Sequence, residues 1–386
     1  MTALDAELAV LGLGAAGSSA LWRAAGRGAS VIGFEQFEPG HPHGSSHGHS
    51  RLFRTALVEG PQYVGLARHA QALWRELEAT TGTELLHLCG GVFLGPEDGR
   101  LVPEVLETIR AHRLPHELLD TAAVRSRFGR HAVDDGTVGV LDPGTGVLYC
   151  ERGIRAAVRA ARVLGAQVRT GERILAIDPA DGQVAVRSLG LAGERTWRFR
   201  RVVVATGAWT GSLLPELTVP MAVRRTLLTW FTPREAAEEF GPNRFGVFLH
   251  EADGYLAWGA PALEGYGVKV GLHDLETPPV PDPGSNPLRV DPEEWAEVAG
   301  WVARRIPGLD PTKVRAEGCM YTDTPDEAFS IGVPDAYPGV VLAAACSGHG
   351  FKHAPAVGDA AAALALAEEP PVDLSEFSPN RFHRTG

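Results

Sequence analysis

Two glycine-rich turns near opposite ends of the 386-residue chain constrain its fold more than any other feature. The first contains Gly12, Gly14 and Gly17, and it lies between an apolar run at residues 7–11 and a small-residue segment at 18–25. A strand, a glycine turn and a helix in this order direct backbone N–H groups and a helix start toward phosphates. The pattern predicts a βαβ unit that binds a dinucleotide.

An acidic residue supports this interpretation. Residues 30–34 read as the second strand of the unit, and Glu35 follows it directly. Its distance from the glycine turn is close to the spacing of about 20 residues expected for a carboxylate that binds a ribose. Because this carboxylate would repel a 2′-phosphate, Glu35 also argues against NADP.

The second glycine turn runs from Ser347 to Lys352 and contains Gly348 and Gly350. It follows an apolar run at residues 340–344 and precedes a predicted helix at 354–368. One turn could bind the phosphates of a nucleotide while the other faces its reactive ring, so that a single cofactor links the two ends of the chain. This arrangement favours a flavoprotein.

The rest of the chain indicates an α/β fold in two layers. Helical periodicity covers residues 63–80, and a further helix is predicted at 151–164. Alternating apolar and polar residues over 219–270 are typical of antiparallel sheet. We therefore predict a Rossmann-type FAD-binding domain and a second domain built on a largely antiparallel sheet plus helices.

Both predicted domains are discontinuous in sequence. The FAD-binding domain takes residues 1–80, 143–215 and 320–386, and the substrate domain takes 81–142 and 216–319. No Pro-rich or Gly/Ser-rich linker separates them cleanly.

Charge and composition narrow the class of partner. The formal net charge is −11 and the sequence pI is about 5.7, which argues against a nucleic-acid or anionic-membrane partner and favours a small molecule. No apolar stretch reaches the roughly 18 residues that a membrane-spanning helix needs. The first ten residues, with Asp5 and Glu7, lack the basic start of a secretory signal. We expect a cytoplasmic monomer whose four cysteines are reduced: Cys89, Cys150, Cys319 and Cys346.

Lysine is scarce in this chain. Its lysines are Lys269, Lys313 and Lys352, and arginine supplies the other basic residues. We infer that lysine is kept where a compact, titratable ammonium matters. Drift under a GC-rich codon bias is the alternative for any one of them.

Four ordered motifs carry a family resemblance. They are the first glycine turn, the segment 44–54, the segment Cys319-Met320-Tyr321-Thr322-Asp323-Thr324-Pro325-Asp326, and the second glycine turn. With these motifs the chain resembles the monomeric sarcosine oxidase and N-methyltryptophan oxidase family over nearly its whole length. The resemblance implies an FAD-dependent oxidase that demethylates a secondary amino acid, uses O₂, and yields an amino acid, formaldehyde and H₂O₂.

The resemblance also implies how FAD is held. It places the covalent link to the flavin 8-methyl group at Cys319, and it places Ser45, Ser46 and Arg51 against the cofactor. A thiolate can add to the activated methyl carbon if nearby cations lower the pKa of the thiol. Inert packing of Cys319 is the alternative, and Cys346 beside the second glycine turn is the rival thiol.

Further roles follow from matched positions. Arg54 and Lys352 correspond to the pair that grips the substrate carboxylate, since a guanidinium fork matches a carboxylate in two hydrogen bonds. Lys269, on a strand predicted to be buried, corresponds to the lysine that activates O₂. His273, four residues later, could accept the amine proton or orient the substrate, and a purely structural role is the alternative.

Three more positions complete the expected pocket. Tyr321 and His349 match pocket residues of the family, whereas Trp258 falls where the family has a tyrosine. A larger ring without a phenol changes both the volume and the hydrogen bonding of the pocket. Sarcosine is therefore the leading substrate, and another N-substituted or cyclic amino acid fits the same reasoning.

Several alternatives stay open. One is a glycine or D-amino acid oxidase that binds FAD without a covalent link, another is a cyclic imino acid oxidase, and a third is a dehydrogenase that passes electrons to a quinone or a protein. A non-catalytic FAD-binding subunit is the fourth. A metal site is not expected in the glycine-rich loop that carries four histidines: His41, His43, His47 and His49.

Overall fold

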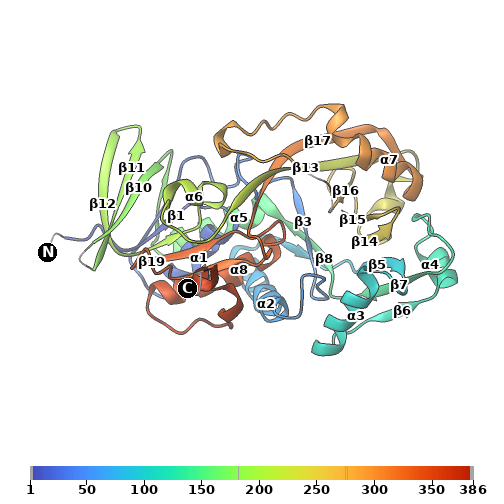
Figure 1. Cartoon of the computed structure of the whole chain (residues 1–386), viewed down its shortest axis with the longest axis horizontal. Helices are drawn as coiled ribbons and strands as arrows, with labels where there is room; N and C mark the ends of the chain where they lie inside the picture. Colours follow the sequence, from blue (N-terminus) through green and yellow to red (C-terminus); the bar gives the residue numbers. More distant parts are fainter. Residues whose placement is uncertain (1–2, 181, 274, 276, 383–386) are drawn as a thin grey trace.

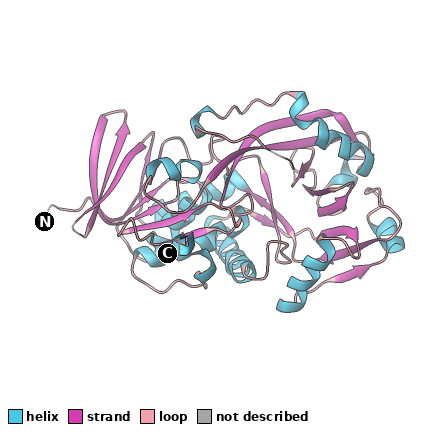
Figure 2. Cartoon of the chain, in the orientation of Figure 1, coloured by secondary structure: helices cyan, strands magenta, loops and turns pink. Residues whose placement is uncertain are grey.

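The computed structural model describes residues 3–180, 182–273, 275 and 277–382. In this part of the chain the strands form three sheets, and the helices lie mainly against the first of them (Figures 1 and 2). The first sheet is largely parallel, the second is largely antiparallel, and a small third sheet joins distant segments of the chain. The predicted fold class is confirmed.

Parallel strands make up the centre of the first sheet. Strand β1 (Ala6–Leu11) lies between β2 (Val31–Glu35) and β12 (Gly193–Val204), and these three strands run in parallel. Apart from the half-buried Arg201, the side chains at the paired positions are apolar and almost fully buried, as expected for a sheet covered on both faces. The remaining strands are β9 (Gln167–Thr170), β10 (Arg173–Ala180), β11 (Gln183–Gly190), β18 (Ser330–Gly332) and β19 (Val340–Ala344).

Helices close to the first sheet come from both ends and from the middle of the chain. Helix α1 (Ala15–Gly26) packs against α5 (Cys150–Val163) and against α8 (Ala354–Ala365). A Cβ atom at Gly358 would lie 2.5 Å from the backbone nitrogen of Ala20, so glycine permits the close approach of α1 and α8. Helix α2 (Tyr63–Thr81) packs on α8 from the other side, and the short α6 (Thr210–Leu213) follows β12.

The second sheet lies on the other side of the molecule, to the right in Figure 1. Its long strands β13 (Ala222–Pro233) and β17 (Leu309–Asp323) pair antiparallel. In the described part of the chain every neighbouring pair in this sheet is antiparallel except β5 with β14. The other strands are β5 (Gly91–Pro96), β6 (Glu117–Leu119), β7 (Thr137–Asp142), β14 (Val247–Ala252), β15 (Tyr255–Ala260) and β16 (Val268–Leu272), with helices α3 (Leu101–His112), α4 (Thr121–Arg127) and α7 (Ala296–Arg305).

A three-stranded sheet lies between these two parts. Strand β8 (Gly146–Tyr149) pairs with β3 (Ser50–Phe53) on one side and with β4 (Leu86–His87) on the other. These strands have two to four residues each, so no periodicity in the sequence predicted them. The division into two discontinuous domains stays a prediction.

Helix boundaries differ modestly from the sequence-based expectation. The first helix begins at Ala15 rather than at residue 18, and the last ends at Ala365 rather than at 368.

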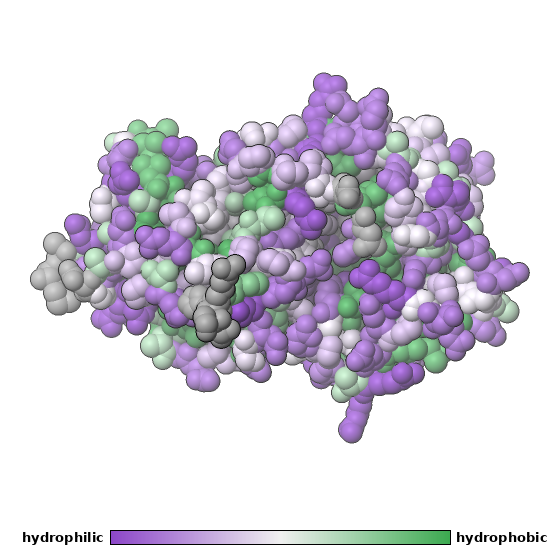
Figure 3. Space-filling model, viewed as in Figure 1, coloured by the Kyte–Doolittle hydropathy of each residue, from purple (hydrophilic) through white to green (hydrophobic). Residues whose placement is uncertain are grey.

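The face of the molecule shown in Figure 3 is mostly hydrophilic, with hydrophobic side chains gathered at the upper left over the β10–β12 hairpins. No helix of the described residues is long and apolar enough to cross a membrane.

The turn between β1 and α1 is shaped by its glycines. Gly12 has φ +83°, and a Cβ atom there would lie 2.7 Å from the carbonyl oxygen of Ala205. A Cβ atom at Gly17 would lie 1.8 Å from the carbonyl oxygen of Gly12. By contrast, a Cβ atom at Gly14 would lie 3.6 Å from the nearest atom, Ser46 Oγ, which is an ordinary contact. The first and third glycines are therefore required by packing, and the second is not.

This difference predicts the stability of two alanine variants. Gly17→Ala should lower the free energy of unfolding of the cofactor-free protein by more than about 2 kcal/mol, because the turn must shift to admit the methyl group. Gly14→Ala, the matched control, should change it by less than about 1 kcal/mol. Urea unfolding measures both variants. Equal effects of the two substitutions would show that this packing is not what constrains the turn.

Candidate active site

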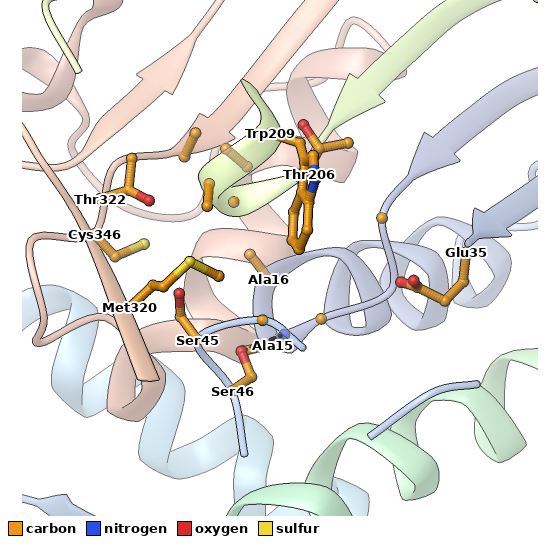
Figure 4. A pocket seen from close by; sticks show the side chains of 18 of the residues that line it. Ala15, Ala16, Glu35, Ser45, Ser46, Thr206, Trp209, Met320, Thr322 and Cys346 are labelled. Carbon is orange, nitrogen blue, oxygen red and sulfur yellow. Dashed lines mark hydrogen bonds between the residues drawn. The ribbon is translucent and has the colours of Figure 1, made fainter. Parts of the chain in front are cut away.

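A cavity of about 640 Å³ opens at the carboxyl ends of four parallel strands of the first sheet. The residues that follow β1, β2, β12 and β19 all line it, as do residues 320–322 of β17 (Figure 4). Cofactors in open parallel sheets bind at this edge, and the volume is typical of ligand sites. The cavity therefore lies where both glycine turns were predicted to meet.

The start of α1 faces this cavity. Gly12, Gly14, Ala15 and Ala16 line it, whereas Gly17 lies outside its lining and supports the turn. Gly14 precedes the helix as its N-cap residue and has no side chain to cap it, so the first N–H groups of α1 can donate hydrogen bonds to an anion. These groups fit the pyrophosphate of the expected FAD.

Glu35 lies at the same edge, with its side chain buried. Its Oε2 accepts a hydrogen bond of 2.8 Å from the backbone of Leu13, and its Oε1 accepts one of 3.0 Å from Phe37. His41 Nε2 lies 3.4 Å from Oε1. Burial alone would raise the pKa of this carboxyl, yet His41 and the two N–H donors outweigh burial and lower it. A charged carboxylate therefore stands where the ribose was predicted to bind.

Most of the predicted cofactor residues share this cavity. Thr206, Trp209, Met320 and Thr322 also line it, and their side chains project into it in Figure 4. The sequence assigned none of these four a role, although Met320 and Thr322 belong to the motif at residues 319–326. The predicted residues found in the lining, besides Gly12, Gly14 and Glu35, are Ser45, Ser46, Arg51, Tyr321, Gly348 and Gly350.

Arg51 connects this cavity to two predicted residues that do not line it. Its Nη2 lies 3.9 Å from Cys319 Sγ, and its Nη1 donates a 2.9 Å hydrogen bond to the carbonyl oxygen of Ser50. The same oxygen accepts a 2.7 Å hydrogen bond from Lys269 Nζ. Arg51 on β3 thus contacts Cys319 on β17 and shares one carbonyl acceptor with Lys269 on β16.

The thiol of Cys319 has a lower pKa than the thiols of Cys150 and Cys346. Burial would raise its pKa, but His47 and Arg51 outweigh burial and lower the pKa to about 7. Burial raises the pKa of Cys150 to about 11 and that of Cys346 to about 12. Cys346 does line the cavity, yet its thiol stays protonated at neutral pH. Cys319 is the one of these three thiols with substantial thiolate character.

His47 was not assigned this role from the sequence. Its ring is 1% exposed, and its Nδ1 lies 3.6 Å from Glu317 Oε2. Burial opposes protonation of His47, but its contacts with Cys319 and Glu317 raise its pKa to about 9. A cation therefore lies beside the thiol. Because His47 is far from β17 in sequence, no local pattern could have paired it with Cys319.

Lys269 is buried, as its strand predicted. It is 1% exposed, and burial together with the nearby Arg51 lowers its pKa to about 7. Its Nζ lies 5.0 Å from the centre of the Trp230 ring. A lysine that points to water is excluded by this burial.

Arg54 and Lys352 converge on a third residue. Glu59 Oε1 accepts hydrogen bonds of 2.7 Å from Arg54 Nη2 and 2.9 Å from Lys352 Nζ. Burial lowers the pKa of Lys352 to about 8 despite the favourable charge of Glu59. Arg54 Nε and Nη1 are buried, with no hydrogen-bond partner among the described residues. The sequence placed the two cations together but gave no signal for Glu59.

The other predicted substrate residues are more dispersed. His349 lies 4.0 Å from Glu59, and burial lowers its pKa to about 4, so that its imidazole is neutral. Trp258 is half-buried on β15, and its ring covers Gly271. His273 follows β16 at an exposed position.

The loop histidines do not form a common site. His41 contacts Glu35, His47 contacts Glu317, and His49 contacts Glu264. Among the residues that the structure describes, no group of three or more His, Cys, Asp or Glu side chains is arranged to bind a metal.

Comparisons with known proteins agree with this geometry. The model of the FAD dependent oxidoreductase family matches residues 7–364. The chain is 34% identical over 378 residues to monomeric sarcosine oxidase from Streptomyces avermitilis, and the aligned region covers 97% of each protein. It is 32% identical over 380 residues to N-methyl-L-tryptophan oxidase from Yersinia pestis, which covers 98% of this chain and 100% of that protein.

Solved structures share the fold. NikD, an amino acid oxidase of nikkomycin biosynthesis, superposes with a TM-score of 0.83 at 23% identity over 98% of each chain. L-proline dehydrogenase from P. horikoshii gives 0.84 at 20% identity over 99% of each chain. The family predicted from the motifs is confirmed. The chain belongs to the FAD-dependent oxidoreductases, in the branch of the monomeric sarcosine oxidases and N-methyltryptophan oxidases.

Proposed function

We propose that this chain oxidatively demethylates sarcosine or a related N-methyl amino acid, with O₂ as electron acceptor and with an amino acid, formaldehyde and H₂O₂ as products. One observation carries the proposal: two buried cations, Arg54 and Lys352, converge beside the second glycine turn. Identity of 34% to a monomeric sarcosine oxidase supports it. A cytoplasmic, monomeric enzyme stays a prediction.

The cation pair has capacity for a substrate carboxylate. Arg54, Lys352 and Glu59 together carry one net positive charge when all three are ionised, so one further carboxylate balances the group. Arg54 Nε and Nη1 are buried donors without a hydrogen-bond partner among the described residues. Buried donors left unpaired are costly, and a carboxylate would satisfy one of them. An α-amino acid or its N-methyl derivative supplies this group.

The remaining residues then act on the amine end of the substrate. With its carboxylate held by Arg54 and Lys352, the N-methyl carbon is fixed in one orientation, which removes much of the entropic cost of the reaction. Bound FAD supplies the two-electron chemistry and returns the electrons to O₂ as H₂O₂. His273 is proposed to accept the amine proton, and Tyr321, His349 and Trp258 are proposed to shape the pocket. Water hydrolyses the resulting substrate imine.

Positive charge serves both halves of the reaction. The start of α8 and the Lys352 ammonium supply positive potential near the second glycine turn. On the other side, the Lys269 ammonium is proposed to stabilise the superoxide formed when O₂ takes its first electron. A unit charge about 4 Å away is worth about 4 kcal/mol at an effective dielectric near 20. That energy corresponds to roughly a thousandfold in rate.

A substrate panel tests the proposed reaction. Peroxide should form with sarcosine or another N-methyl amino acid, and more slowly with glycine or with proline.

Arg54→Met should raise KM about 10- to 100-fold, because it removes charge-assisted hydrogen bonds to the carboxylate. Arg289→Met is the matched control at an exposed site and should leave KM unchanged. Absence of peroxide with every N-methyl amino acid would contradict the proposal, as would an unaltered KM in Arg54→Met.

Acid precipitation tests the proposed covalent link. The pellet of the native protein should stay yellow, and Cys319→Ser should release its flavin into the supernatant because the thioether cannot form. Cys346→Ser and Cys150→Ser are controls of the same chemistry and should keep a yellow pellet, since their thiols are protonated at neutral pH. A colourless native pellet would remove the link from this account, and a colourless Cys346→Ser pellet would move it to the rival thiol.

A further inference from the structure

The ammonium of Lys269 is bound by a single turn of backbone. Its Nζ donates hydrogen bonds of 2.9 Å to the carbonyl oxygen of Gly48 and 2.7 Å to that of Ser50. No carboxylate of the described residues forms an ion pair with it. Because an unpaired buried ammonium is costly, these two carbonyls are the main compensation for its loss of water.

This turn has an uncommon backbone conformation. Gly48 has φ +93° and His49 has φ +66°, so two successive residues lie in the left-handed region. Ser50 N donates a 2.7 Å hydrogen bond to Gly48 O across the turn. A left-handed conformation at a residue other than glycine costs on the order of 1 kcal/mol, so the surroundings must hold His49 in place.

Glu151 binds two backbone N–H groups of this turn. Its Oε1 accepts hydrogen bonds of 2.7 Å from Gly48 N and 3.2 Å from His49 N. The neighbouring Cys150 N donates a 3.0 Å hydrogen bond to His49 O. The first two residues of α5 thus bind the groups of the turn that do not face Lys269, which leaves the carbonyls of Gly48 and Ser50 directed at the ammonium.

We propose that residues 48–50 form a carbonyl clamp for the Lys269 ammonium and that Glu151 is the positioning residue that keeps this clamp closed. The inference deepens the proposed function, because its consequence for catalysis rests on Lys269 as the group that activates O₂. The clamp itself is a claim about position and proton occupancy, which can be measured without turnover.

Several charged or titratable groups face Lys269 besides the clamp. They are Arg51 on β3, Cys150 and Glu151 on α5, Cys319 on β17, and the His49 ring of the clamp. The residues paired with Lys269 on β13 and β15, Trp230 and Ala260, carry no charge. Burial and Arg51 lower the pKa of Lys269, while Cys150, Cys319 and the carboxylate of Glu151, in that order, raise it. With a pKa of about 7, Lys269 is protonated in about half of the molecules near neutral pH. Loss of Glu151 should therefore remove protons from Lys269.

The scarcity of lysine makes a direct measurement possible. In holoprotein labelled with ¹³C and ¹⁵N at lysine, only Lys269, Lys313 and Lys352 contribute side-chain signals, and Lys269→Met assigns the first. An NMR titration should place the pKa of Lys269 near 7 in the native protein. In Glu151→Ala it should fall by at least one unit, which reduces the ammonium at pH 7 from about half to about a tenth.

Matched variants separate geometry from charge. Glu151→Gln keeps an oxygen that can accept both N–H groups, so its shift should be smaller than that of Glu151→Ala. Glu264→Gln removes a carboxylate that lies beside the His49 ring but does not bind the turn, and it should leave the titration of Lys269 unchanged. The signal of Lys313, which is exposed beside Asp310, is an internal control.

A second pair of variants covers the case in which Glu151→Ala does not fold. His49→Gly suits the positive φ and should preserve the native titration, whereas His49→Val disfavours that conformation and should lower the pKa of Lys269. A pKa of Lys269 that is the same in every folded variant would overturn the clamp.

Oxygen reactivity then separates this inference from the proposed function. At pH 7, reoxidation of reduced Glu151→Ala by O₂ should slow about fivefold, in line with the loss of ammonium. If the titration shifts while the oxygen rate does not, the clamp is supported and the proposed role of Lys269 is wrong.

Discussion

One carbonyl oxygen, that of Ser50, accepts hydrogen bonds from both Arg51 and Lys269, and the site depends on this shared contact. Two like charges are held together in a buried place, which the fold can tolerate only because backbone dipoles face both of them. The contact joins β3 to β16, and Arg51 extends it to Cys319 on β17. Three segments far apart in sequence are thereby fixed against one edge of the cofactor cavity.

The site has two electrostatic ends that do different work. At one end Arg54 and Lys352 share Glu59 and keep spare donors for a carboxylate. At the other, Arg51 and Lys269 donate hydrogen bonds to carbonyl groups, and no carboxylate of the described residues forms an ion pair with either cation. The first end is suited to bind an anion of full charge. The second keeps a cation of low pKa, suited to a charge that develops only during reaction.

The sequence predicted the local parts of this arrangement and missed those that depend on distant contacts. The glycine turn and Glu35 were recognisable because strand, turn, helix and carboxylate follow each other closely. Glu59 and Glu151 were not, since each acts through residues on other elements, and Glu151 lies 103 positions from the Gly48 amide that it binds. Strand β3, with four residues, was too short to leave a periodic signal. The position of the Ser50 carbonyl group that binds Lys269 depends on the left-handed backbone of His49, and no residue pattern predicted that conformation.

The central claim is that a buried ammonium at position 269 promotes the reaction of the reduced enzyme with O₂. Stopped-flow reoxidation of anaerobically reduced Lys269→Met measures this step alone, with Lys313→Met as an exposed control. The rate in Lys269→Met should be about a thousandfold lower than that of the native protein, with reduction by substrate much less affected. An oxygen rate in Lys269→Met equal to that of Lys313→Met would contradict it.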